Sequence, residues 1–106
     1  MTDDDPGGGV WRVEVSSPAH RALQRLPEKV AVAVVEFITG TLPSDPYRMS
    51  KPLHAPLQGW RVARRGDYRV ILEILEDDGV LHIGGIDHRA DAYRTSSMPP
   101  RRGIDQ

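Results

Sequence analysis

Alternating apolar and polar positions predict a strand near the start of the chain. Trp11, Val13 and Val15 alternate with Arg12 and Glu14. Successive side chains of a strand point to opposite faces, so a period of two gives the strand one apolar and one polar face. We therefore expect this segment to cover the core with one face and to meet solvent with the other.

The period then changes to that of a helix. The tripeptide Ser16-Ser17-Pro18 is typical of a helix start, because serine caps free backbone amides and proline needs none in the first turn. Apolar residues recur behind it at helical spacing, at Ala19, Ala22, Leu23 and Leu26. This pattern predicts a first helix with one apolar stripe, which ends near Pro27.

Residues 28–40 fit two kinds of element. The β-branched run that begins at Val30 is compatible with a short buried strand. Val30, Val34 and Ile38, however, repeat every four residues, and the segment is longer than a typical strand before it reaches Gly40. We interpret it as a second helix that stops at this glycine.

Strand patterns return after a proline-rich segment. Residues 41–56 contain four prolines and are predicted to form a loop. Three strands are expected after it, at 59–65, 68–74 and 80–87. Glycine-containing turns separate these strands, at Arg65-Gly66-Asp67 and Asp77-Asp78-Gly79. Gly84 and Gly85 in the last strand indicate a bulge or a close approach of backbones.

The elements follow one another as strand, helix, helix, strand, strand, strand. Each helix has one apolar stripe, which it can bury only against another layer. We predict a small single-domain α+β protein, in which two N-terminal helices pack on a mainly antiparallel four-stranded sheet.

Length and composition agree with one folded unit and two loose ends. The chain has 106 residues, of which 39% are hydrophobic and 27% are charged, as in an ordinary globular domain. Residues 1–9 hold three aspartates and three glycines and are expected to be disordered. Residues 95–106 are expected to be a flexible tail. The predicted domain therefore spans residues 10–94.

Missing residue types narrow the chemistry. The chain has no cysteine, which excludes a disulfide scaffold, a thiolate metal site and a cysteine nucleophile. The four histidines lack metal-ligand spacing, and we expect neither a metal nor a cofactor. The N-terminus lacks the apolar run of a signal peptide, and the longest apolar stretch is too short to span a bilayer. We expect a cytoplasmic protein without a membrane partner.

Positive charge is concentrated in one part of the chain. The net charge of -1 excludes a uniformly basic nucleic-acid binder. Between residues 46 and 69, however, one acidic residue stands against six basic ones, for a local charge of +5. The basic residues are Arg48, Lys51, Arg61, Arg64, Arg65 and Arg69. This concentration is typical of contact with a polyanion, because each neutralised phosphate releases counterions. The alternative is a solvated strand face.

Three further polar residues follow the last strand. His88 is suited to general acid–base chemistry, because the reference pKa of histidine is close to neutral pH. Arg89 is suited to holding a phosphate, and Tyr93 to stacking on a base. A hydrogen-bonded structural histidine and a tyrosine that caps the core are the alternatives.

Several of these segments resemble the RelE/ParE superfamily of bacterial toxins. The similarity is carried by Leu57-Gln58-Gly59-Trp60, Arg64-Arg65-Gly66-Asp67-Tyr68-Arg69-Val70-Ile71, Ile86-Asp87-His88-Arg89 and Tyr93. The resemblance implies the toxin of a type II toxin–antitoxin system, with the RelE-like fold. In the RelE-like branch it implies an endonuclease that cleaves mRNA in the ribosomal A site. It also implies an acidic, RelB-like antitoxin as partner.

The resemblance implies roles for individual residues. The catalytic candidates are Arg69, Arg89, Tyr93, His88, Arg61 and Arg64, and the candidates for RNA phosphate contact are Arg48, Lys51 and Arg65. RelE-like enzymes carry two basic residues at alternate positions of the second strand, but here Ala63 follows Arg61 at that spacing. Arg64 takes this place only if a one-residue bulge separates the strand from Gly66. The register of this strand therefore stays open.

Two other functions also stay open. ParE-like members of the superfamily inhibit DNA gyrase without cleaving RNA, and their recognition would use the helices and the tail. A degenerate member would fold and bind without being toxic. The nuclease is favoured if one concave face is lined by Arg61 or Arg64 together with Arg69, Arg89 and Tyr93. If these side chains point to opposite faces of the sheet, the nuclease has no site.

Overall fold

Helices and strands follow each other in the predicted α+β order. The computed structural model describes residues 11–88. The elements of this part are β1 (Arg12–Val15), α1 (Ser17–Arg25), α2 (Glu28–Glu36), a π-helical turn (Phe37–Thr41), α3 (Leu42–Ser44), α4 (Pro46–Met49), β2 (Ser50–Pro52), β3 (Arg61–Arg65), β4 (Tyr68–Leu75) and β5 (Val80–His88). The predicted tails, 1–9 and 95–106, lie outside the described residues, so the domain limits stay a prediction.

The described strands form one mixed sheet of five strands in the order β1-β5-β4-β3-β2. β1 runs parallel to β5, and the other neighbours are antiparallel, as predicted. The predicted count of four strands is wrong, because β2 lies within the segment that we expected to be a loop. Pro52 is compatible with this strand because β2 is at the edge of the sheet, where a proline need not donate to a second neighbour.

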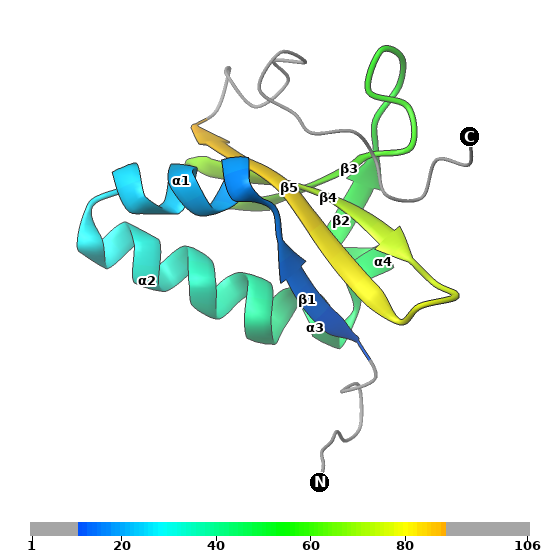
Figure 1. Ribbon diagram of the computed structural model, residues 1–106, viewed down its shortest axis with the longest axis horizontal. Helices are drawn as coiled ribbons and strands as arrows, with labels where there is room; N and C mark the ends of the chain where they lie inside the picture. Colours follow the sequence, from blue (N-terminus) through cyan, green and yellow to red (C-terminus); the bar gives the residue numbers. More distant parts are fainter. Residues whose placement is uncertain (1–10, 89–106) are drawn as a thin grey trace, which may run out of the picture.

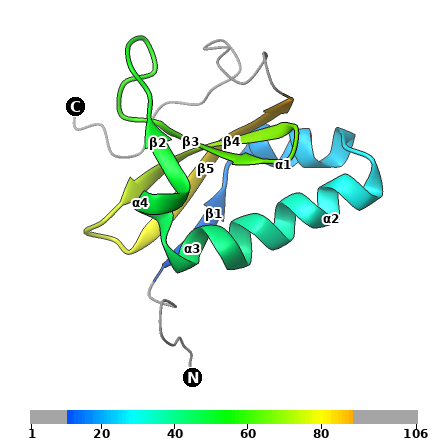
Figure 2. The same cartoon turned by 180° about the vertical axis from the view of Figure 1, so that it is seen from behind.

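One face of the sheet carries the two predicted helices. Figures 1 and 2 show α1 and α2 next to each other, with the loop between β2 and β3 projecting away from them. The main core cluster lies between these helices and the sheet, and its buried members include Ala19, Val34, Ile38, Val70 and Leu72. This packing confirms the helical interpretation of residues 28–36.

The second helical segment does not stop at Gly40. It continues through the π-helical turn into α3, where the amide of Leu42 donates to the carbonyl of Phe37, five residues back. Phe37 and Ile38 are buried, so core packing holds the chain in this conformation past the glycine. Two of the four prolines of the predicted loop, Pro43 and Pro46, lie in the first turns of α3 and α4, where a missing amide costs little.

The start of α1 is tied to the last strand. The N-cap is Ser16, whose hydroxyl accepts from the amide of Ala19 (3.2 Å) and donates to the carbonyl of Gly84 (3.1 Å). Gly84 is the extra residue of a β-bulge, because Ile71 pairs with Gly85 and Leu72 pairs with Ile83. The predicted bulge is thus present, and Ser16 satisfies the carbonyl that the bulge turns out of the ladder.

The other face of the sheet is covered in part by the loop between β2 and β3. Leu57 and Trp60 are buried there on Ile71 of β4, with Leu53 and Val62 packed against them. The Trp60 ring also lies beside the imidazole of His82, with ring centroids 6.0 Å apart. Apolar packing therefore fixes both faces of β3 and β4.

Two glycines offer a matched test of the backbone. Gly40 is in the helical segment and a Cβ there would meet nothing within 4 Å, so Gly40→Ala should raise the free energy of unfolding by about 0.5–1 kcal/mol. Gly66 is equally open but has a φ of +60°, which a side chain strains. Gly66→Ala should therefore lower the free energy of unfolding by about 1 kcal/mol. Chemical denaturation of both variants checks the signs, and a loss of stability in Gly40→Ala would contradict the helical continuation.

Candidate functional site

The pairing of β3 with β4 decides the register that the sequence left open. Ala63 pairs with Val70, and Arg64 pairs with Arg69, without a bulge in this pair of strands. Ala63 and Val70 belong to the core beneath the helices. Since successive side chains alternate, Arg64 and Arg69 lie together on the opposite face of the sheet.

A shallow hollow brings these two arginines together with two more cations. Its volume is about 250 Å³, and it is lined by Arg48, Met49, Ser50, Lys51, Val62, Arg64 and Arg69. Four of these described lining residues are basic, and none of them is acidic. Each of the four was predicted as a site residue. We call these seven residues the basic hollow.

Short elements form one wall of the basic hollow. Asp45 caps α4, with its carboxylate accepting from the amide of Arg48 (3.4 Å), and this helix presents Arg48 and Met49. Lys51 follows on β2, where it pairs with Val62 of β3. The opposite wall comes from β3 and β4. The hollow thus spans four neighbouring elements, and its guanidinium and ammonium groups suit several phosphates of one strand.

Asp87 is a neighbour of this site that the sequence reasoning missed. It pairs with Arg69 across β4 and β5 and is half-buried. Directly opposed residues of opposite charge attract each other across a sheet, which favours one orientation of the arginine. Counting from the hairpin turn at 77–79 alone would place Ile86 opposite Arg69. The extra residue of the bulge at Gly84 moves Asp87 into this position, so the register could not be counted from the turn. Glu73 shares the face of Arg69 but is only 1% exposed.

Arg61 lies outside the basic hollow. It pairs with Leu72, a member of the main core, so its side chain leaves β3 on the face opposite to Arg64. There its guanidinium donates to the hydroxyl of Ser50 (2.7 Å) and to the carbonyls of Tyr47 (3.2 Å) and Ser50 (3.0 Å). It also stacks over the Tyr47 ring at 5.2 Å from the centroid. Burial and a hydrogen bond with Glu76 raise the pKa of Tyr47 above its usual value of 10.0, so this hydroxyl stays protonated at neutral pH.

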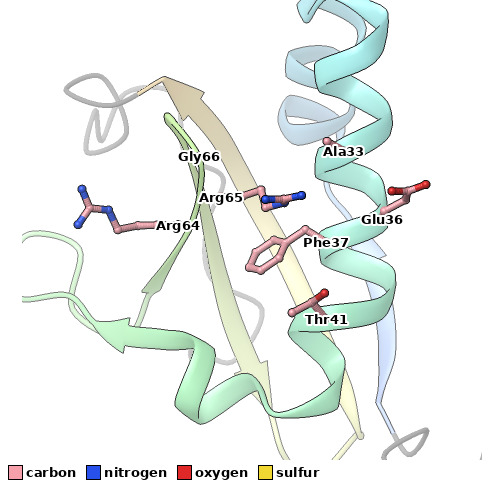
Figure 3. A pocket seen from close by; sticks show the side chains of 7 residues that line it. All are labelled: Ala33, Glu36, Phe37, Thr41, Arg64, Arg65 and Gly66. Carbon is pink, nitrogen blue, oxygen red and sulfur yellow. The ribbon is translucent and has the colours of Figure 1, made fainter.

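Arg65 lies in a different hollow, next to α2. Figure 3 shows its side chain reaching towards the helix, whereas Arg64 points away from it. This second hollow has a volume of about 460 Å³ and is lined by Ala33, Glu36, Phe37, Thr41, Arg64, Arg65 and Gly66. The basic run in the sequence is therefore divided between the two faces of the sheet.

The other predicted residues lie at or beyond the end of β5. His88 is the last residue of this strand and pairs with Tyr68, so its register position is on the face that carries the helices, opposite to that of Arg69. Arg89 and Tyr93 lie outside the described residues, so their proposed roles stay predictions. The end of β5 thus lies beside the start of β4, where Tyr68 and Arg69 stand.

Residues 11–88 lack two other classes of site. No group of three or more histidine, aspartate or glutamate side chains in this part of the chain is arranged to hold a metal ion. No helix among these residues is long and apolar enough to cross a membrane.

Sequence comparisons identify the family. Residues 13–93 match the family described as ParE toxin of type II toxin-antitoxin system, parDE. Toxin RelE of Mycobacterium tuberculosis is 44% identical over 106 residues, which span 95% of this chain and 100% of that protein. Toxin RelG of the same organism is 42% identical over 84 residues, or 79% of this chain and 97% of that protein.

Solved structures agree with the sequence matches. The RelBE2 toxin–antitoxin complex of Mycobacterium tuberculosis gives a TM-score of 0.72 at 39% identity, covering 74% of this chain and 98% of that one. An archaeal RelE–RelB complex from Pyrococcus horikoshii gives 0.61 at 28% identity, covering 78% and 99%. The isolated E. coli RelE toxin shares the fold, with a TM-score of 0.62 at 12% identity and coverage of 78% and 88%.

The chain therefore belongs to the family of ParE toxins of type II toxin–antitoxin systems. Within this family it is a RelE-like toxin, as its similarity to the two mycobacterial toxins and to the RelBE2 structure shows.

Adjacent arginines on opposite faces give a direct test of the basic hollow. Arg64→Met should weaken binding of a single-stranded oligonucleotide and lower the slope of log K against log salt by about 0.7 per lost phosphate contact. Arg65→Met removes the same charge one residue away, on the face of α2. It should leave the slope unchanged. Fluorescence anisotropy at several salt concentrations checks both, and equal effects of the two substitutions would contradict this division of the arginines.

Proposed function

We propose that this RelE-like toxin is an endoribonuclease that cleaves translated mRNA in the ribosomal A site and so inhibits translation. The observation that supports this function is the convergence of Arg64 and Arg69 with Arg48 and Lys51 in one hollow. A gyrase inhibitor that acts by binding alone has no need of such a cluster on the sheet.

Cleavage proceeds by attack of the ribose 2′-oxygen on the adjacent phosphorus. The 2′-hydroxyl loses its proton, the new P–O2′ bond forms and the P–O5′ bond breaks. The products are a 2′,3′-cyclic phosphate and a 5′-hydroxyl, which takes up a proton. The phosphorane between them carries additional negative charge, so fixed cations stabilise it more than they stabilise the substrate.

The residues of the basic hollow and those predicted at the end of β5 have different roles in this reaction. Arg69, held opposite Asp87, stabilises the charge on the phosphorane, and Arg89 is its predicted partner in this role. Arg64, Arg48 and Lys51 bind phosphates around the scissile one. An arginine is a poor proton donor at neutral pH, and His88 remains the predicted group for proton transfer. Tyr93 stacks on a base or orients the 2′-hydroxyl.

The ribosome contributes positioning. A 2′-oxygen reacts only when it lies in line with the leaving oxygen, and a free RNA strand seldom holds this arrangement. An mRNA bound in the A site is already ordered, which lowers the entropic barrier.

A cognate antitoxin restrains this activity in our proposal. The similar toxins of Mycobacterium tuberculosis and Pyrococcus horikoshii were solved as complexes with their antitoxins. We infer an acidic, RelB-like partner, whose charge complements the basic hollow. Cytoplasmic localisation follows from this function, because both the ribosome and the antitoxin are there.

A second candidate function is inhibition of DNA gyrase. It is favoured by the matching family, which is described by its ParE toxins. Inhibition of gyrase does not require the convergent arginines, and it predicts intact mRNA in growth-arrested cells.

Induction of the toxin without an antitoxin in a bacterial host tests the proposal. Primer extension on a translated reporter mRNA should show breaks inside codons, and these should disappear when the start codon of the reporter is removed. Arg69→Ala and Arg89→Ala should each reduce cleavage by about 10²–10³, the loss caused by removing one group that stabilises a transition-state charge.

Arg21→Ala is the matched control, because Arg21 is an exposed arginine of α1, far along the chain from the basic hollow. Its cleavage pattern should match that of the wild type. Growth arrest with intact mRNA and a DNA-damage response would contradict the nuclease and support inhibition of gyrase. Abundant folded protein without growth arrest would instead identify a non-toxic homologue.

A further inference from the structure

Arg61 joins two segments that are otherwise connected by a long loop. The segment formed by α4 and β2 supplies Arg48, Met49, Ser50 and Lys51 to the basic hollow. Residues 53–60 separate it from β3, and β2 pairs with β3 over only three residues, Ser50–Pro52. Such a short edge strand leaves this wall weakly held by backbone pairing alone.

The guanidinium of Arg61 reinforces this connection. Its Nε donates to the hydroxyl of Ser50 at 2.7 Å, and one Nη donates to the carbonyls of Ser50 and Tyr47 at 3.0 and 3.2 Å. The Ser50 hydroxyl in turn donates to the carbonyl of Pro46 at 2.6 Å. The bond to Ser50 is short and charge-assisted, and Ser50 is only 5% exposed, so water competes little for it.

The same contacts leave Arg61 few free donors for a ligand. A guanidinium is a planar fork of five donors, and here its Nε and one Nη are engaged by α4 and β2. Its face is occupied by the Tyr47 ring. Its position on β3, opposite in parity to Arg64, also directs it away from the phosphates that Arg64 and Arg69 would bind.

We propose that Arg61 is a positioning residue, which sets the distance between the two walls of the basic hollow without contacting RNA. This wall carries Arg48 and Lys51, so its position determines how far these two cations lie from Arg64 and Arg69. The proposal rests on the function inferred above, in that the ligand of the hollow is RNA. It replaces the direct catalytic role that the resemblance implied for Arg61.

Ser50→Ala tests this role without changing any charge. It removes the principal acceptor of Arg61 and leaves every cation in place. We expect the Kd for a short single-stranded RNA to rise about fivefold in Ser50→Ala and about tenfold in Arg61→Met, because both release the wall. Arg61→Lys keeps one donor for Ser50 and should recover part of the loss. Arg21→Met, which removes an exposed arginine of α1, should change the Kd less than twofold.

A double-mutant cycle separates positioning from direct contact. When Arg48 and Lys51 are both replaced by Met, the further substitution Arg61→Met should have almost no effect on the Kd, because the wall that it positions carries no cation. If Arg61 contacted a phosphate directly, Arg61→Met would raise the Kd tenfold in this background as well and would lower the salt slope by a further ~0.7. Additivity of this kind would overturn the proposal.

Two further measurements complete the test. Cleavage of mRNA on translating ribosomes, at saturating ribosome concentration, should change less than threefold in Ser50→Ala and Arg61→Lys, whereas KM should rise with the Kd. A hundredfold fall in kcat would make Arg61 catalytic and overturn the proposal. The Nε–H resonance of Arg61 should be sharp in the NMR spectrum of the wild type and lost in Ser50→Ala, which shows that folded protein has lost this contact. A wild type that binds no RNA would overturn the proposed function, and with it this role. Binding by the wild type with additive variants would overturn the inference alone.

Discussion

The pairing of β3 with β4 is the constraint on which the site depends. A tight turn at Gly66 and Asp67 joins the two strands, so that Arg65 pairs with Tyr68 and Arg64 with Arg69. Because side chains alternate along each strand, this single register assigns every residue of the pair to a face. A shift of one residue would exchange the two faces and carry the arginines into the core.

Apolar packing on both sides makes such a shift costly. Beneath the helices, Ala63 and Val70 are almost fully buried, at 1% and 0% exposure. On the other side, Val62 and Ile71 pack with Trp60 of the loop between β2 and β3. The hydrophobic effect therefore stabilises the fold and aligns Arg64 with Arg69 through the same side chains. The alignment of the two arginines therefore does not depend on contacts between the polar side chains of the basic hollow.

Periodicity was enough to predict the elements that bury a regular face. The helical spacing of Val30, Val34 and Ile38 and the turn at Gly79 are local signals, and the elements that they predict are present. The prolines of residues 41–56 misled the interpretation, because proline is compatible with the first turn of a short helix and with an edge strand. Gly40 is similar, since tertiary packing of Phe37 and Ile38 outweighs its weak preference against helix. The environment of Arg61 had no sequence signal, because its acceptors are backbone carbonyls and a serine eleven residues away.

The arrangement of charge explains why phosphate binding and proton transfer would fall to different residues in this toxin. The residues that line the basic hollow supply cations and include no carboxylate. Of the carboxylates on the same face of the sheet, Glu73 is buried and Asp87 stands opposite Arg69. A neighbouring carboxylate holds an arginine in one orientation but also offsets part of its charge. Within residues 11–88 the basic hollow thus offers a cluster of cations, as the proposed binding of a phosphate strand requires. Under the proposed function, the predicted proton donor is His88 and the ribosome supplies the in-line geometry. Such a toxin would bind free RNA without cutting it efficiently, because only an ordered strand presents the 2′-oxygen in line with the leaving oxygen.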